Sequence, residues 1–156
     1  MAQKIIIDAD AGIGDAVAAT LAILDPDVDV LAITATAGCV PGPTATRNIQ
    51  AIIELLDPPK HPRMGSSEAE LPPISPFANL ACANRRALNG PFGLGDAEFG
   101  GADLHHPHES AKLMIELVRN EPYEITLLTL GPLTNLEIAC ERAPEFLSLL
   151  KGIVCQ

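Results

Sequence analysis

The sequence predicts an α/β fold: an open, mostly parallel Rossmann-like sheet with helices on both faces. One observation is that β-branched apolar runs alternate with segments whose apolar residues recur at helical spacing, the order expected of βαβ units. A second is that the first strand candidate is continuously apolar, which is typical of parallel strands covered on both faces. The third is that residues 4–36 hold a strand, a helix and a strand in immediate succession.

The first βαβ unit sets the pattern for the chain. It consists of a strand over residues 4–9, a helix over residues 13–24 and a strand over residues 28–36. The apolar residues of the helix at helical spacing are Ile13, Val17, Leu21 and Leu24, with small alanines between them. We expect this face to pack the helix closely onto the sheet. The crossover should be right-handed, with the two strands parallel.

The rest of the chain continues the alternation. Further strands are expected over residues 62–65, 124–130 and 151–156, and helices over residues 44–56, 77–88, 109–120, 133–140 and shortly after Ala143. Pro144 suits an early helical position, where its missing N–H costs nothing. The segments on either side of the 77–88 helix are rich in proline and glycine, and long loops in a compact domain are often functional.

Composition excludes several classes of function. The formal net charge is -10, which argues against a nucleic-acid-binding protein, because such proteins need a basic face. No apolar run approaches the roughly 20 residues that a membrane span needs, and the N-terminus lacks a signal-peptide pattern. The four cysteines form no CxxC pair, so we expect reduced, mostly buried thiols in a cytoplasmic protein.

Three carboxylates follow the first strand within one short turn. They are Asp8, Asp10 and Asp15. In an open α/β sheet, ligands bind beyond the carboxyl ends of the strands. Carboxylates clustered there are suited to bind a hard cation or to perform catalysis. The alternative is that these residues serve only as loop and cap residues.

Four motifs together resemble the inosine–uridine-preferring nucleoside hydrolase family. They are Asp8–Asp15 (DADAGIGD), Leu130–Asn135 (LGPLTN), Thr46-Arg47-Asn48 and Gly93-Leu94-Gly95. Their order and approximate spacing agree with the family, whose members begin with Asp-Thr-Asp-Pro-Gly-x-Asp-Asp. The resemblance extends over essentially the whole chain. It corresponds to about the first half of a family member.

The resemblance implies Ca²⁺-dependent hydrolysis of the N-glycosidic bond of ribonucleosides, giving base and ribose. Asp10 and Asp15 would be carboxylate ligands of Ca²⁺, and Leu130 would add its main-chain carbonyl. Asp10 would also take a proton from the attacking water as general base, and Asp8 would orient the loop from below. This chemistry is sound, because Ca²⁺ prefers oxygen ligands and an anionic cluster stabilises an oxocarbenium-like transition state.

Four positions depart from the family pattern. Gly14 replaces a carboxylate that contacts a ribose hydroxyl, Cys39 replaces an asparagine, Asn89 stands where a histidine is frequent, and Ala11 replaces a proline. We assign Gly14, Cys39 and Asn89 to the substrate-binding side. Their replacement implies a different substrate or a reduced or absent activity.

The resemblance also places a further Asp ligand, a histidine and an Asn/Glu ribose clamp in a second half that these 156 residues do not contain. We therefore expect a single α/β domain over residues 1–156 that is the N-terminal half of a longer one. A chain ending at Gln156 should bind Ca²⁺ weakly and show no turnover. Family members are homodimers or homotetramers, which implies the same here, with a nucleoside as the small-molecule partner.

Two other function classes remain open. A non-catalytic homologue that binds a nucleoside or sugar is favoured by Gly14 and Cys39. An Mg²⁺-dependent phosphohydrolase with an aspartate nucleophile also fits an Asp-x-Asp after a strand, but Gly12 and the lack of a matching lysine weigh against it. His105, His106 and His108 suggest either a metal site or solvated side chains, and Cys39 either a reactive or a packed thiol.

Overall fold

The computed structural model of the chain describes residues 2–71, 87–99 and 108–156. Its strands are β1 (Gln3–Ala9), β2 (Val28–Ala35), β3 (Arg63–Ser66), β4 (His108–Glu109), β5 (Thr126–Thr129) and β6 (Gly152–Cys155). Its helices are α1 (Ile13–Leu24), α2 (Gly42–Leu56), α4 (Ser110–Asn120), α5 (Thr134–Arg142) and α6 (Phe146–Leu149). The helix predicted over residues 77–88 lies mostly outside the described residues.

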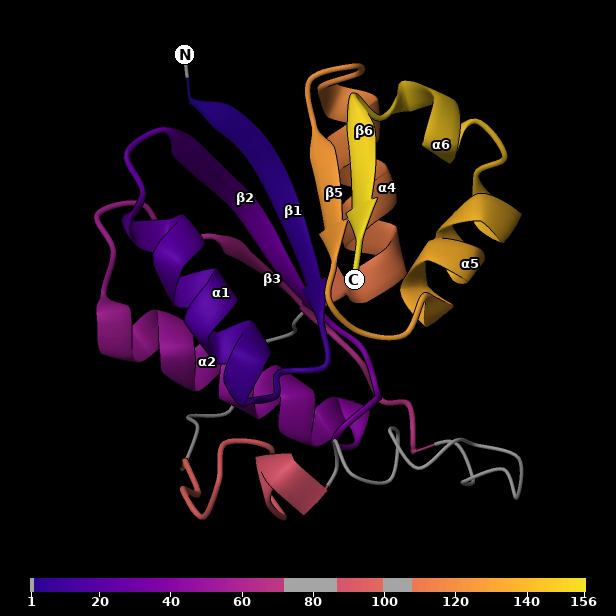
Figure 1. The fold of residues 1–156 in the computed structure, drawn as a ribbon. Coiled ribbons are helices and arrows are strands. Elements are labelled where there is room, and N and C mark those ends of the chain that lie inside the picture. The colour runs from indigo at the N-terminus through magenta and orange to yellow at the C-terminus, as the bar shows by residue number, and fades with distance from the viewer. Residues whose placement is uncertain (1, 72–86, 100–107) are drawn as a thin grey trace.

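The described strands form one sheet in the order β4-β3-β2-β1-β5-β6, and every neighbouring pair is parallel (Figure 1). The chain proceeds outward from β1 to β4 on one side and then continues on the other side with β5 and β6. The order therefore reverses at β1. In open α/β sheets the crevice beyond the carboxyl ends of the strands at such a switch point is the usual ligand site.

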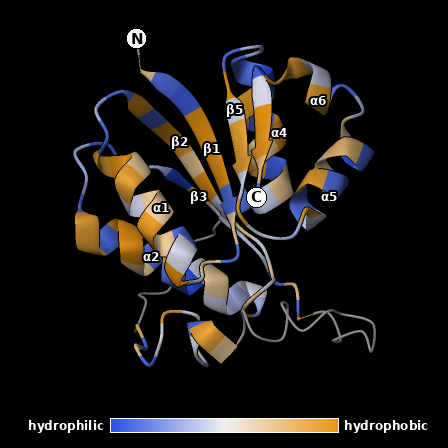
Figure 2. Ribbon diagram, in the orientation of Figure 1, coloured by the Kyte–Doolittle hydropathy of each residue, from blue (hydrophilic) through white to orange (hydrophobic). Residues whose placement is uncertain are grey.

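Helices cover both faces of the sheet, as the sequence predicts (Figures 1 and 2). One core contains Ile5 and Ile7 of β1 with side chains from α1 and α2, including Ile49 and Ile53. The other contains Ile6 of β1 with side chains from α4, α5 and α6. The alternation along β1 shows why this strand is continuously apolar: each of its faces is buried in a different core.

The prediction for the packing of α1 is wrong. Its four apolar residues at helical spacing are the exposed ones: Ile13, Val17, Leu21 and Leu24 are 44%, 55%, 66% and 63% exposed. The residue buried against the sheet is Ala19, at 4% exposure, with Ala22 and Ile23 packed beside it. Small side chains allow a close approach of helix and sheet, so the alanine face of α1 faces inward.

Smaller differences concern short elements. The two-residue strand β4 was not predicted, because so short a segment carries no periodicity. The short helix α6 begins at Phe146, so Pro144 precedes it instead of lying at an early helical position. Within residues 2–71, 87–99 and 108–156, no helix combines the length and hydropathy needed to cross a lipid bilayer.

Candidate functional site

The candidate site lies where β1 ends between β2 and β5. Backbone hydrogen bonds continue the sheet on both sides of this end: Thr36 N–H donates to Ala9 O at 3.0 Å, and Leu130 N–H donates to Asp8 O at 2.8 Å. The loops that follow β1, β2 and β5 therefore leave the sheet at one place. This is the switch point of the strand order, and it brings residues 8–15, 36–40 and 130–135 together.

Asp8 is fully buried beneath this loop cluster. Its Oδ1 accepts hydrogen bonds from Thr34 Oγ1 at 2.6 Å and Asn135 Nδ2 at 2.8 Å. Burial raises the pKa of Asp8 to about 6, although both hydrogen bonds oppose the shift. Asp8 Oδ2 and Thr129 Oγ1 are buried without a hydrogen-bond partner in the part of the chain that the structure describes. Asp8 is thus an internal carboxylate that ties β1 to β2 and α5.

The loop after β2 packs against Asp10 and hydrogen-bonds to it. Cys39 N–H donates to Asp10 Oδ2 at 2.8 Å, and Cys39 Sγ lies 3.2 Å from Asp10 O and 3.3 Å from Asp10 Oδ1. Gly38 permits this approach, because a Cβ there would lie 2.7 Å from Asp10 Cβ. Burial, and next the negative charge of Asp10, raise the pKa of the Cys39 thiol. Cys39 is a packed thiol, not a reactive one.

The carboxyl group of Asp15 lies near that of Asp10. Burial, followed by a hydrogen bond to Asp10 and repulsion from its charge, raises the pKa of Asp15 to about 8. Asp15 Oδ2 is buried and accepts no hydrogen bond from any described residue. Two carboxyl groups near each other, one with an unpartnered buried oxygen, are the surroundings in which a bound cation would be stabilised. The residues present therefore fit part of the oxygen-ligand shell of a hard cation such as Ca²⁺.

The geometry nevertheless supplies few ligands. Among the described residues, no group of three or more His, Cys, Asp or Glu side chains is arranged to hold a metal ion. Asp8 is engaged with Thr34 and Asn135, which leaves the Asp10–Asp15 pair as the available carboxylates. Because Ca²⁺ takes 6–8 oxygen ligands, most of the shell would have to come from main-chain carbonyls, water, substrate or residues beyond this set.

The turn after β5 packs directly on the Asp10 loop. A Cβ at Gly131 would lie 3.0 Å from Asp10 N and 3.2 Å from Asp10 Cβ, so only glycine fits between the two loops. Leu130, whose carbonyl the resemblance assigns to Ca²⁺, is therefore adjacent to Asp10. The Gly131-Pro132 turn serves this contact.

Asn48 links the glycine-rich loop around Gly93 to the loop that follows β1. It is 3% exposed, and its Nδ2 donates to Ala11 O at 3.2 Å and to Phe92 O at 2.7 Å. Gly93 lies against the same groups with φ +86°, where a side chain would be strained. The Thr46–Asn48 and Gly93–Gly95 motifs therefore meet in space, and their asparagine holds two loops in contact.

The three positions assigned to the substrate side have different surroundings. Asn89 is half-buried, and its Oδ1 accepts from Ile13 N–H at 2.8 Å, which caps the start of α1. Cys39 is occupied with Asp10, as described above. Gly14 is exposed in the first turn of α1, and a Cβ there would meet nothing within 4 Å. Only the Gly14 position is open to an added group.

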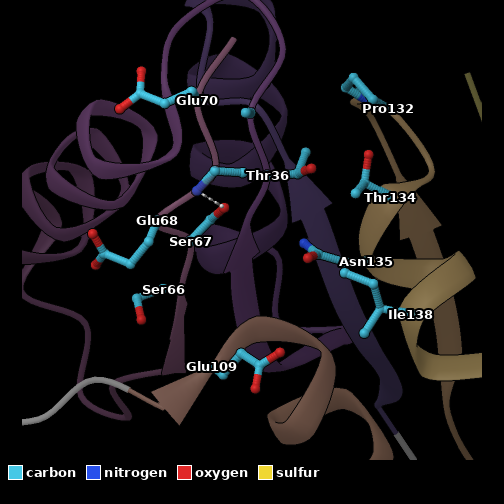
Figure 3. A pocket seen from close by; sticks show the side chains of 12 residues that line it. Thr36, Ser66, Ser67, Glu68, Glu70, Glu109, Pro132, Thr134, Asn135 and Ile138 are labelled. Atoms are coloured by element: carbon cyan, nitrogen blue, oxygen red, sulfur yellow. Dashed lines mark hydrogen bonds between the residues drawn. The ribbon is translucent and has the colours of Figure 1, made fainter. Parts of the chain in front are cut away.

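A cavity of about 790 Å³ lies beside this loop cluster, over the carboxyl ends of β2 to β4 (Figure 3). Its lining includes Thr36, Asn135 and the carboxylates of Glu68, Glu70 and Glu109. The cavity therefore lies next to the switch point, between Thr36 and α5.

Some roles of these residues were missed by sequence reasoning. The position of Asn135 at the start of α5 suggests a cap role, yet the N-cap of α5 is Leu133 without a side-chain cap bond, and Asn135 reaches Asp8 instead. The sequence carries no signal of this role, because a buried amide needs partners but its burial is set by the fold. His105 and His106 lie outside the described residues, and His108 is exposed in β4. Of the described cysteines, Cys39 is buried and Cys155 exposed, so the prediction of mostly buried thiols holds only in part.

Comparisons with known proteins agree with the fold. A sequence profile described as inosine-uridine preferring nucleoside hydrolase matches residues 5–155. Uridine nucleosidase 1 of Arabidopsis thaliana is 35% identical over 97% of this chain and 44% of its own length. The inosine-uridine preferring nucleoside hydrolase of Crithidia fasciculata is 32% identical over 99% of this chain and 48% of its own.

A solved structure of a plant nucleoside hydrolase superposes on 99% of the chain with a TM-score of 0.79 at 33% identity, and 48% of that structure is covered. The chain thus spans about half the length of the relatives it matches.

Proposed function

The chain belongs to the inosine-uridine preferring nucleoside hydrolase family, and we propose that it provides the cation-binding half of a Ca²⁺-dependent ribonucleoside hydrolase. The observation that carries this proposal is Asp15 Oδ2, which is buried at the switch point of the sheet without a hydrogen-bond partner among the described residues, near the carboxyl group of Asp10. The reaction is hydrolysis of the N-glycosidic bond, giving base and ribose.

Asp10, Asp15 and the main-chain carbonyl of Leu130 would hold the ion. When bound, Ca²⁺ lowers the pKa of water and binds sugar hydroxyls. Asp10 accepts the proton of the attacking water as general base, and the Cys39 N–H on its Oδ2 fixes the carboxylate in place. The negative charge of this cluster stabilises the positive charge that develops on the sugar.

Asp8 supports this arrangement from within the sheet. It stays hydrogen-bonded to Thr34 and Asn135 and does not contact substrate. The phosphohydrolase alternative loses support for the same reason, because a fully buried carboxylate offers no accessible nucleophile.

Gly14, Cys39 and Asn89 would face the ribose. Gly14 brings no polar group to it, and the side chains of Cys39 and Asn89 already bond to Asp10 and to the Ile13 N–H. These observations favour a second candidate function, a homologue that binds a nucleoside without hydrolysing it. The relatives span about twice the length of this chain, so turnover would also require groups outside it.

We further propose a homodimer or homotetramer in the cytoplasm, a reducing compartment in keeping with the free thiols.

Calorimetric titration of the 156-residue chain with CaCl₂, followed by inosine or uridine in the presence of Ca²⁺, tests the proposal. We expect saturable Ca²⁺ uptake, Ca²⁺-dependent nucleoside binding and no release of ribose. Asp15→Asn is the matched control, because it keeps the side-chain volume and removes a carboxyl group that can ionise to bind the ion. Equal Ca²⁺ uptake by this variant and the wild type would contradict the assignment of the ion, and ribose release would contradict the need for a second half.

A further inference from the structure

Asn135 lies at a junction between three elements. It is 6% exposed, near the start of α5, and both hydrogens of its amide are used. Nδ2 donates to Asp8 Oδ1 on β1 at 2.8 Å and to Ala35 O at the end of β2 at 2.8 Å. One side chain thus joins the carboxyl ends of two strands to a helix more than 90 residues later in the chain.

Together with a backbone hydrogen bond, the bond from Asn135 to Asp8 holds both ends of the turn that follows β5. At the start of the turn, Leu130 N–H donates to Asp8 O at 2.8 Å. At its end, Asn135 donates to Asp8 Oδ1. Asp8 therefore holds the turn at both ends, and between them Gly131 is pressed against Asp10. The turn that contains Leu130 is therefore held against the main chain and Cβ of Asp10.

We propose that Asn135 is a positioning residue of the cation site: it fixes the Leu130–Asn135 turn on Asp8 so that the Leu130 carbonyl stands beside Asp10 and Asp15. This inference rests on the proposed Ca²⁺ site. It assigns to Asn135 a role in setting ligand geometry, in addition to the stability that any satisfied buried amide contributes.

Ser110 provides a matched control for a purely structural role. Its Oγ is buried and donates to the same carbonyl, Ala35 O, at 2.8 Å, and it also lies 3.0 Å from Ser66 O. Ser110→Ala therefore also removes a buried donor from Ala35 O. Among the described residues, Ser110 makes no hydrogen bond to residues 8–15, so its loss should not alter the cation site.

The experiment compares wild type, Asn135→Ala and Ser110→Ala by Ca²⁺ calorimetry and by amide hydrogen exchange of the Ca²⁺-free protein. We expect Asn135→Ala to weaken Ca²⁺ binding roughly 10- to 100-fold, as supporting residues of metal sites do. The Leu130 amide should exchange faster in this variant. Ser110→Ala should keep the wild-type Ca²⁺ affinity and Leu130 exchange rate, although its melting temperature also falls. Asn135→Ser, which keeps one donor, carries the same comparison if Asn135→Ala does not fold.

The outcomes separate the two proposals. If the wild type binds Ca²⁺ and Asn135→Ala binds it equally well, the positioning role is overturned and the proposed function stands. Equal weakening by Asn135→Ala and Ser110→Ala would mean that affinity follows stability alone, which also overturns the positioning role. A wild type that takes up no Ca²⁺ overturns both.

Discussion

The two sides of the candidate site differ in how strongly the fold constrains them. The proposed metal side consists of Asp8, Asp10, Asp15 and Leu130, and the proposed sugar side of Gly14, Cys39 and Asn89. On the metal side, backbone and side-chain bonds from β2, β5 and α5 converge on one strand end. On the sugar side, two residues serve the loops themselves and the third is an exposed glycine.

This difference shows that the residues at the end of β1 are tied into the sheet, whereas the Gly14 position is not. The metal side is built from groups that also hold the sheet together, so altering them disturbs the fold. A Cβ at Gly14 would meet nothing within 4 Å, so we expect the fold to accept a side chain there.

The largest expected effect is on the metal side. Asp10→Asn keeps the shape of the side chain but removes one of two carboxylates of the proposed ion site. We expect Ca²⁺ affinity to fall roughly 100-fold or more, since groups that only support metal ligands already contribute 10- to 100-fold. Calorimetry measures the loss, and circular dichroism checks that the fold is kept. An unchanged affinity would remove the proposed distinction between the two sides.

A smaller effect is expected where the glycine-rich loop joins the first loop. Asn48→Ala leaves Ala11 O and Phe92 O without their donor in a buried place. The free energy of unfolding should fall by about 1–3 kcal/mol, measured by urea denaturation.

Arg47→Ala is the control, because Arg47 is the exposed neighbour of Asn48 in the same motif. Its effect should stay within about 0.5 kcal/mol. Similar losses in the two variants would show that the link between the loops does not contribute.

The smallest effect is expected at Gly14. Gly14→Asp restores the carboxylate of the family pattern in open space. We expect it to strengthen inosine binding in Ca²⁺ up to about tenfold, the effect of one added hydrogen bond to a sugar hydroxyl. Titration calorimetry with inosine measures this.

Gly14→Ala separates helix propensity from the carboxylate. It should stabilise α1 by about 0.5–1 kcal/mol without strengthening inosine binding. If both variants bind inosine equally, the carboxylate does not contact the sugar, and the sugar side lies elsewhere.

Much of the fold could be predicted because its elements have clear local patterns. The continuous apolar run of β1, the periodic helices α2 and α4 and the proline and glycine punctuation all agree with the structure. The inward face of α1 could not be predicted in this way. Its large apolar residues and its alanines both recur at helical spacing, and the close approach to the sheet selects the alanines.

The candidate site shows the same limit. The motifs locate Asp8, Asp10 and Asp15 at a strand end, but spacing alone does not reveal that Asp8 turns inward while Asp10 pairs with Asp15. Nor does the spacing reveal that Asn48 and Asn135 hydrogen-bond to loops and strands distant in the sequence. Each bonds to groups at least 37 residues away in the chain.

The sequence by itself determined the fold class, the family and the place of the acidic loop, because periodicity, turn residues and motif order are local properties of the chain. Only the tertiary structure decided which carboxylates face inward, which face of α1 is buried and which of the positions departing from the family pattern is open. Those outcomes depend on hydrogen bonds and close contacts between segments far apart in sequence, whose partners are set when the strands align in one sheet.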